Sequence, residues 1–113
     1  MNSTDCIFCK IAKKELSTKI IFENDGFVAF NDLKPVSPTH ILVIPKKHCN
    51  NLSEVEDKDL LGKLLLTVKT IAKQEGLSEG FRTVINTGDN GGQTVYHFHL
   101  HILGGRFHKW PPG

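Results

Sequence analysis

Several features that mark other classes of protein are missing from this 113-residue sequence. No apolar run approaches the roughly 20 residues that a membrane-spanning helix needs. Residues 1–6 lack the basic segment and apolar run of a secretory signal. No low-complexity tract and no repeat at a fixed period divides the chain. We therefore expect one domain, residues 1–113, with a cytoplasmic location.

The sequence also has little excess charge of either sign. Its 14 Lys and Arg residues nearly balance 12 Asp and Glu residues, giving a formal net charge of +2 with histidine neutral. Proteins that bind nucleic acid or membrane surfaces usually carry a basic cluster, and residues 46–48 are too short to make one. The composition therefore predicts neither kind of partner.

Cysteine is scarce, and the three residues present are an odd number. A disulfide framework is therefore not expected, and the thiols should be buried, reactive or metal-bound. Cys6 and Cys9 form a C-x-x-C pair that supplies half of a tetrahedral zinc site. A thioredoxin-type redox role would need a preceding strand and a following long helix, which the sequence lacks. Cys49 has no partner at a useful spacing and is expected to be a buried or idle thiol.

What the sequence does contain is a concentration of histidine, because three of its six histidines fall within residues 97–101. Histidines and apolar residues alternate through residues 96–103, which predicts a strand. His97, His99 and His101 would then share one face, about 6 to 7 Å apart, since a strand rises roughly 3.3 Å per residue. An adventitious metal site remains a simpler alternative for such a row.

The rest of the chain reads as strands with one main helix. Residues 19–23 and 27–30 are strand-like and flank an Asp-Gly turn signal, and residues 40–45 form an apolar run typical of a strand buried on both faces. A capping-box pattern predicts that a helix begins at Ser53 or at Asp57 and continues to Glu75, before Gly76. Residues 81–86 alternate as a further strand, and a glycine-rich loop, 87–94, leads into the histidines. The order predicts an α+β domain with antiparallel connections.

The expected apolar stripe of the helix contains Leu60, Leu61, Leu64, Leu65, Val68, Ile71 and Ala72. Leu66 lies off this stripe, which suggests a second apolar surface that could meet a partner subunit.

A row of imidazoles suits chemistry at phosphorus. Oxyanions on phosphorus repel anionic nucleophiles, whereas a neutral imidazole can attack without being ionised first. The attacking ring needs its second nitrogen to donate to a fixed acceptor, so that the other nitrogen carries the lone pair. Neighbouring N–H donors would stabilise charge on the phosphate oxygens. His99, central in the row, is the best placed candidate.

Residues 97–103 also fit the pattern of alternating histidine and apolar residues of the histidine-triad (HIT) superfamily of nucleotide hydrolases and transferases. The chain resembles the histidine-triad nucleotide-binding (Hint) branch more than the dinucleoside-polyphosphate hydrolase (Fhit) branch. The resemblance extends over Asp32 and its proline-containing loop, over residues 38–40, 44–48, 91–96 and 104–106, and over Trp110-Pro111-Pro112-Gly113.

This resemblance implies a HIT-like fold: about five antiparallel strands, one long helix and a short N-terminal helix, dimerising into a continuous sheet. It implies hydrolysis of purine nucleoside phosphoramidates through a nucleotidyl-histidine intermediate, with no catalytic cofactor. Alternatives are a nucleotide-binding or scaffold protein with little catalytic role, a dinucleoside polyphosphate hydrolase, or a hydrolase that uses the three histidines as metal ligands.

The resemblance also implies residue roles. His99 would be the nucleophile, His101 a donor to phosphate, and Gln93 and Thr94 neighbours of the scissile bond and leaving group. Thr94 stands where many Hint relatives have serine, although the hydroxyl remains. The other implied nucleotide-site residues are His40 beside the triad, Asp32 at the ribose, Asn86 and Gly92 near phosphate, and Phe8, Ile11, Phe30, Leu33 and Ile41 around the base.

For the cysteines, the resemblance implies a structural zinc site made of Cys6, Cys9, His48 and His97, because some bacterial relatives hold zinc in this way. The alternative is that both cysteines are reduced and metal-free. Simpler interpretations also exist elsewhere. Asp32 could be only a turn residue, and His40 could be only a structural histidine. The residues expected around the base, called the base-wall residues below, could be only part of the core. His108 lies outside every motif and is expected to be a solvated loop residue.

Overall fold

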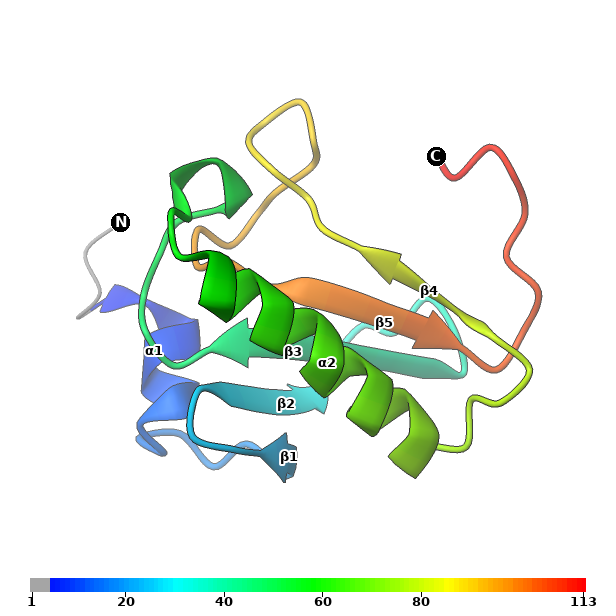
Figure 1. Ribbon diagram of the computed structural model, residues 1–113, viewed down its shortest axis with the longest axis horizontal. Coiled ribbons are helices and arrows are strands. Elements are labelled where there is room, and N and C mark those ends of the chain that lie inside the picture. Colours follow the sequence, from blue (N-terminus) through cyan, green and yellow to red (C-terminus); the bar gives the residue numbers. More distant parts are fainter. Residues whose placement is uncertain (1–4) are drawn as a thin grey trace.

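A computed structural model describes residues 5–113. One five-stranded antiparallel sheet, with strand order β1-β2-β3-β5-β4, carries a helix on each side (Figure 1). The elements in chain order are α1 (Ile7–Ala12), β1 (Ile20–Glu23), β2 (Phe27–Asn31), β3 (Thr39–Pro45), a short 3-10 helix η2 (Leu52–Glu54), α2 (Lys58–Gln74), β4 (Phe81–Val84) and β5 (Leu100–Gly104). The predicted α+β architecture is therefore confirmed.

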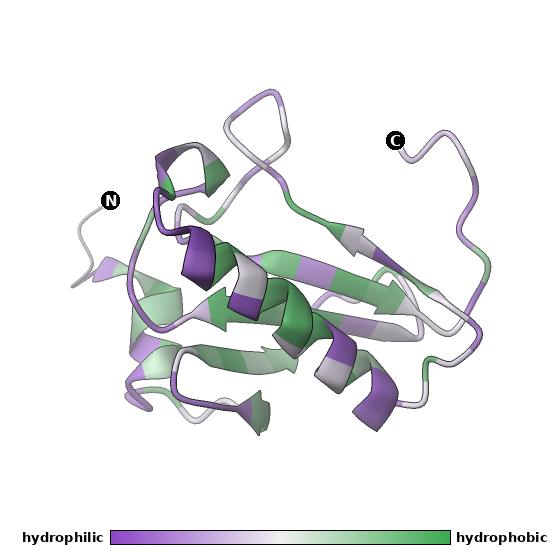
Figure 2. Cartoon of the chain, viewed as in Figure 1, coloured by the Kyte–Doolittle hydropathy of each residue, from purple (hydrophilic) through white to green (hydrophobic). Residues whose placement is uncertain are grey.

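The sheet separates two groups of buried side chains, because successive residues of a strand point to opposite faces. On one face, α2 covers Ala29, Val43, Leu100 and Ile102, among others. On the other face, α1 packs against Val28, Phe30, Leu42 and Ile44. The apolar residues follow the central strands and the inner side of α2 (Figure 2).

Helix α2 begins at the second of the two predicted positions. Asp57 is its N-cap, and the carboxylate accepts hydrogen bonds from the backbone N–H groups of Asp59 and Leu60, at 2.9 and 3.2 Å. Ser53 lies in η2 instead, so its capping box does not start the helix. At the other end Gly76 has a φ of +72°, a left-handed conformation that glycine adopts at little cost after a helix.

The predicted apolar stripe of α2 is too wide. Leu64, Val68, Ile71 and Ala72 are buried, whereas Leu65 remains 55% exposed. A helix that packs on a single sheet buries only one side, and Leu65 lies beyond its edge.

The histidine strand begins later than predicted, at Leu100 instead of Tyr96. The backbone N–H of Phe98 donates to the carbonyl of Cys49 at 2.6 Å, so this segment bonds to the chain leaving β3 and not to a strand. The alternation of side chains survives, because Phe98, Leu100 and Ile102 all lie in the core beneath α2. His97, His99 and His101 therefore face the other side.

Neither helix in residues 5–113 combines the length and apolar character needed to cross a membrane. The prediction that a secretory signal is absent concerns residues 1–6, of which 1–4 lie outside the described residues.

Candidate functional site

Helix α1 brings its two cysteines against the histidine face of the sheet. Cys6 is the N-cap, and its sulfur accepts a hydrogen bond from the backbone N–H of Cys9 at 3.4 Å. Both thiols are buried. One turn of helix therefore fixes the two sulfur atoms on the same side, facing His97 and His48.

These four residues form a compact cluster of metal-binding atoms. Cys6 Sγ lies 3.3 Å from His97 Nδ1, Cys9 Sγ lies 3.3 Å from His48 Nδ1, and the two Nδ1 atoms are 3.2 Å apart. All four ligand atoms lie within 4.8 Å of one another. Tetrahedral zinc, with Zn–N about 2.05 Å and Zn–S about 2.3 Å, separates two nitrogens by about 3.4 Å and a nitrogen from a sulfur by about 3.6 Å. The cluster has nearly these dimensions.

Hydrogen bonds at Nε2 of both histidines leave Nδ1 of each ring able to bind a cation. His97 Nε2 donates to the carbonyl of Pro45 at 2.7 Å, and His48 Nε2 donates to Asn50 Oδ1 at 3.1 Å. Each neutral ring then has a lone pair on Nδ1 that points toward the cysteine sulfurs, where a cation could bind all four atoms. The chemistry of the donor set therefore fits a structural zinc ion.

Burial adjusts the ionisation of the same residues. It lowers the pKa of His97 to about 4, so the ring is neutral near pH 7, as a metal ligand must be. Burial, and then the hydrogen bond with Cys6, raise the pKa of the Cys9 thiol to about 11. A divalent cation would supply the positive charge that favours the thiolate.

His99 has the orientation that a nucleophilic imidazole requires. Its Nδ1 donates to the carbonyl of His97 at 2.7 Å, which leaves the lone pair on Nε2. Burial lowers the pKa of His99 below its usual value, so the ring is neutral near pH 7. Phe8 holds the ring edge-to-face, with ring centroids 5.2 Å apart.

A chain of hydrogen bonds sets the tautomer of His101. The backbone N–H of Val36 donates to His40 Nδ1 at 3.1 Å, so the ring hydrogen of neutral His40 is on Nε2. His40 Nε2 then donates to His101 Nδ1 at 2.9 Å, which places the hydrogen of His101 on Nε2. Burial, the largest cause, lowers the pKa of His101 to about 4. His101 is thus a neutral donor next to His99, with centroids 5.1 Å apart.

Asp32 extends this chain, with Oδ2 3.5 Å from His40 Nε2. Asp32, His40 and His101 therefore lie close enough together to suggest a second metal site. The hydrogen bond from Val36 argues against one, because it leaves a hydrogen on the His40 nitrogen that would have to bind the ion.

The glycine-rich loop carries the remaining polar candidates. Gln93 is buried, and its amide nitrogen donates to the carbonyls of Asn50 and Val95, at 2.7 and 3.1 Å. These two contacts use both amide hydrogens of Gln93, and they hold the loop in place.

Asn86 donates to the Gly91 carbonyl at 2.7 Å. Thr94 is exposed. Gly92, with a φ of +79°, turns the backbone just before Gln93.

The expected base-wall residues do not all meet on one surface. Phe8, Ile11 and Phe30 are buried together on the histidine side of the sheet. Leu33 lies in the loop after β2 and is 97% exposed. Ile41 is fully buried under α2, on the opposite side, so we leave it out of the proposed base contacts.

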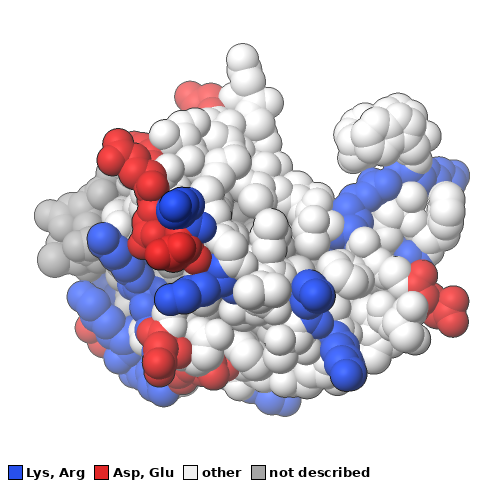
Figure 3. Space-filling view, viewed as in Figure 1, with Lys and Arg blue, Asp and Glu red and all other residues white. Residues whose placement is uncertain are grey.

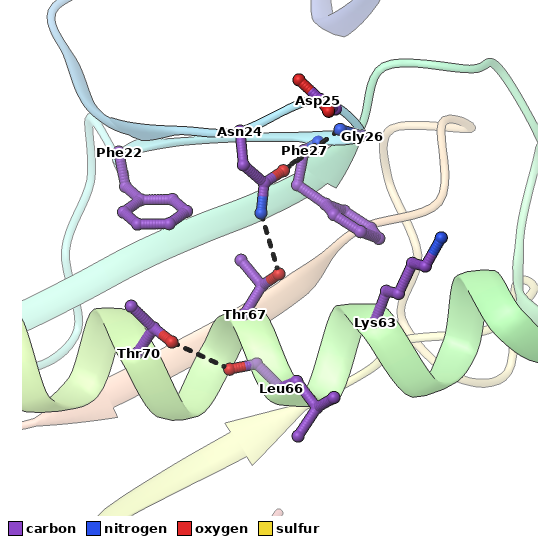
Figure 4. A pocket seen from close by; sticks show the side chains of 9 residues that line it. All are labelled: Phe22, Asn24, Asp25, Gly26, Phe27, Lys63, Leu66, Thr67 and Thr70. Carbon is purple, nitrogen blue, oxygen red and sulfur yellow. Dashed lines mark hydrogen bonds between the residues drawn. The ribbon is translucent and has the colours of Figure 1, made fainter.

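A hollow of about 590 Å³ lies elsewhere. The tip of the β1–β2 hairpin and α2 enclose it, and none of the predicted site residues lines it (Figure 4). Asn24 and Thr67 bridge it by a hydrogen bond of 3.2 Å. On the face that Figure 3 shows, acidic and basic side chains intermingle without a large patch of one sign.

Several site contacts were missed from the sequence. The backbone groups of Pro45 and Val36, which orient His97 and His40, leave no residue-type signal at all. Asn50, two residues after His48, could have been proposed as its partner, since a polar neighbour of a metal-binding histidine often orients the ring. His108, expected to be solvated, is half-buried and hydrogen-bonded to Ser37.

Comparison with known proteins agrees with this geometry. Residues 13–108 match the family model described as HIT domain. The chain is 52% identical to a protein named adenylylsulfatase HINT1 from Arabidopsis thaliana, over 95% of this chain and 76% of that protein. It is 50% identical to a 14 kDa zinc-binding protein from Brassica juncea, over 96% and 100% of the two chains. A crystal structure of a HIT family hydrolase from Legionella pneumophila superimposes with a TM-score of 0.93 at 47% identity, covering 96% of this chain and 100% of that one.

Proposed function

The chain belongs to the HIT domain family, and from that membership we propose that it hydrolyses purine nucleoside phosphoramidates through a covalent intermediate at His99. Its relatives support a nucleotide hydrolase in general. The observation that carries the finer proposal is the hydrogen bond from His99 Nδ1 to the His97 carbonyl, because it directs a lone pair outward from a neutral ring.

In the proposed reaction, His99 Nε2 attacks the α-phosphorus of the substrate. A bond forms between this nitrogen and phosphorus, the P–N bond to the leaving group breaks, and the departing amine takes up a proton from solvent water. His101 donates a hydrogen bond from Nε2 to a phosphate oxygen as charge develops there, and keeps its proton. Water then attacks phosphorus and releases one proton to solvent, the bond to His99 breaks, and a nucleoside monophosphate leaves.

The residues around the nucleotide have subsidiary roles in this proposal. Thr94 is proposed to offer its exposed hydroxyl at the leaving-group side, and Asp32 is proposed for the ribose. Phe8 and Phe30 are proposed for the base, together with Ile11 beneath them. Gln93 shapes the phosphate loop through its backbone contacts.

Cys6, Cys9, His48 and His97 are proposed to hold zinc in a purely structural role. All four possible coordination positions would be filled by protein, and such closed sites stabilise folds instead of activating water. The relative named a zinc-binding protein supports this assignment. The ion would fix α1 to the segment that carries His99.

The test is hydrolysis of adenosine 5′-phosphoramidate, followed by phosphorus NMR, with wild type, His99→Ala and Lys109→Ala. Lys109 has an exposed side chain outside the site, so this control should match wild type. We expect His99→Ala to lose at least about a thousandfold in turnover, with binding of nucleoside monophosphate retained in calorimetry. Unchanged turnover would refute the proposal.

Two further experiments distinguish the phosphoramidate hydrolase from the alternative functions. Adenylyl sulfate and a dinucleoside polyphosphate, offered at equal concentration, show whether another leaving group is preferred. Turnover by folded protein from which a chelator has removed zinc would exclude a catalytic metal, and binding without any turnover would favour a scaffold protein.

A further inference from the structure

We propose that the C-terminal segment 105–109 acts as a clamp that sets the tautomer of His101 by holding the loop before β3. The proposal rests on the proposed function in one respect only, the use of His101 Nε2 as a hydrogen donor. Its physical basis is that the backbone N–H of Val36, together with the Asp32 carboxylate near His40 Nε2, determines which nitrogen carries the hydrogen in two successive rings.

The dependence on Val36 follows from hydrogen-bond direction. A backbone N–H can only donate, so His40 Nδ1 must accept, and His40 Nε2 must then donate to His101 Nδ1. Without the Val36 contact, His40 could carry its hydrogen on Nδ1 instead. The ring of His101 could then donate from Nδ1 to His40 and lose the outward hydrogen on Nε2.

The loop that presents Val36 is held by the clamp at three consecutive residues. Arg106 Nη2 donates to the Val36 carbonyl at 3.1 Å, and Ser37 Oγ lies 2.7 Å from His108 Nε2. Gly105 lies directly against Pro38, because a Cβ added to this glycine would be 2.8 Å from Pro38 Cβ. The residue whose N–H orients His40 is therefore held through its own carbonyl and through the two residues that follow it.

The clamp is itself anchored to the sheet. Arg82 on β4 donates through Nη2 to the carbonyls of His108 and Lys109, at 3.0 and 2.7 Å. These contacts join β4, the C-terminal segment and the loop before β3 (Figure 1). Ser37 is buried, so its hydroxyl has a protein partner where water has little access. Losing that partner should release the loop, because a buried unpaired hydroxyl is unfavourable.

The experiment compares Ser37→Ala, His108→Ala and the double variant with wild type and with Lys109→Ala, which leaves the backbone acceptor of Arg82 in place. Long-range proton–nitrogen NMR correlations in unliganded protein identify the tautomer of His101 directly. We expect one Nε2–H form in wild type and Lys109→Ala, and a mixture of tautomers in the clamp variants.

Turnover provides the second readout. The clamp variants should lose roughly tenfold in kcat with KM nearly unchanged, as for other residues that orient a functional histidine. The double variant should lose no more than either single variant, because the two residues form one contact. Thermal melting confirms that each variant is folded before it is compared.

A purely structural clamp would lower the melting temperature but leave His101 in the Nε2–H form and kcat within about twofold of the Lys109→Ala control, and this result would overturn the proposal. The NMR measurement needs no substrate. If wild type fails to hydrolyse the phosphoramidate while the tautomer still changes in the variants, the proposed function fails and the clamp stands.

Discussion

The carbonyl oxygen of His97 accepts the Nδ1 hydrogen of His99 at 2.7 Å, while the ring of His97 faces the two cysteines of α1. One residue thus belongs to the candidate zinc site through its side chain and to the candidate catalytic site through its backbone. The coupling between the two sites can be tested by substitutions in the zinc site or in the catalytic site.

Zinc content is the first test. We expect Cys9→Ser to lose the zinc that wild type binds and to melt at least about 5 °C lower, because a structural metal contributes directly to folding. Cys49→Ser is the matched control, since Cys49 is also a free thiol but lies outside the cluster. Plasma mass spectrometry and calorimetry measure both effects. Wild-type protein that takes up no zinc would show that the cysteines are metal-free.

The core under α2 gives a stability test. Leu64 is 1% exposed, so Leu64→Ala should lower the free energy of unfolding by about 2 to 5 kcal/mol. Lys69→Ala, on the exposed side of the same helix, should change it by less than about 0.5 kcal/mol. Urea unfolding followed by circular dichroism measures both values. Equal effects would mean that α2 does not pack as described.

The glycine-rich loop gives a steric test. A Cβ at Gly91 would overlap the backbone oxygen of Thr87, so Gly91→Ala should displace the loop and lower turnover at least about tenfold. Gly62 in α2 has open space around it, so Gly62→Ala should stabilise the protein by up to about 1 kcal/mol and leave turnover unchanged. A fully active Gly91→Ala variant would contradict the loop geometry.

Acid stability depends on Glu23. Hydrogen bonds from Lys14 and then Lys46 lower the pKa of Glu23 to about 2, from 4.5. A carboxylate with a lowered pKa stabilises the fold above its unfolded pKa, and this contribution disappears as pH falls toward 2. The melting temperature of wild type should therefore exceed that of Glu23→Gln above pH 5, and the difference should shrink toward pH 2. A difference that does not depend on pH would exclude the ionic contribution.

The homodimer that the family resemblance implies can be tested at the surface of α2. Leu66 is 61% exposed and lines the hollow of Figure 4, although it is apolar. We expect wild type to sediment as a dimer at micromolar concentration and Leu66→Asp to shift toward the monomer. Leu16→Asp, at another exposed leucine, should remain dimeric. Monomeric wild-type protein would refute this prediction.

Much of the fold could be predicted because its signals are local. Alternation indicated the strands at residues 81–86 and 96–103, a turn signal indicated the first two strands, and the polar residues before Lys58 located the start of α2 within two choices. The side chains on each face of the sheet were harder to assign in β3, since an apolar run buried on both faces carries no alternation. Ile41 was expected beside the base from the family resemblance alone, and the pattern of β3 could not show that it lies under α2.

The candidate site was predictable in its residue types but not in its contacts. The three histidines and the two cysteines stand out by their spacing. The backbone groups that orient them do not, because any residue has a carbonyl and almost any residue has an N–H. The same holds for the late start of β5, which depends on the carbonyl of Cys49, almost fifty residues earlier in the chain.

Because the core cluster beneath α2 lies on the face of the sheet opposite the histidines, heat tolerance can be adjusted there with little effect on chemical selectivity. Leucine, isoleucine and valine exchanges beneath α2 would tune durability while the imidazole cluster keeps its arrangement. A protein engineer could accordingly raise the thermal stability of this protein from one face of the sheet and change its substrate preference from the other.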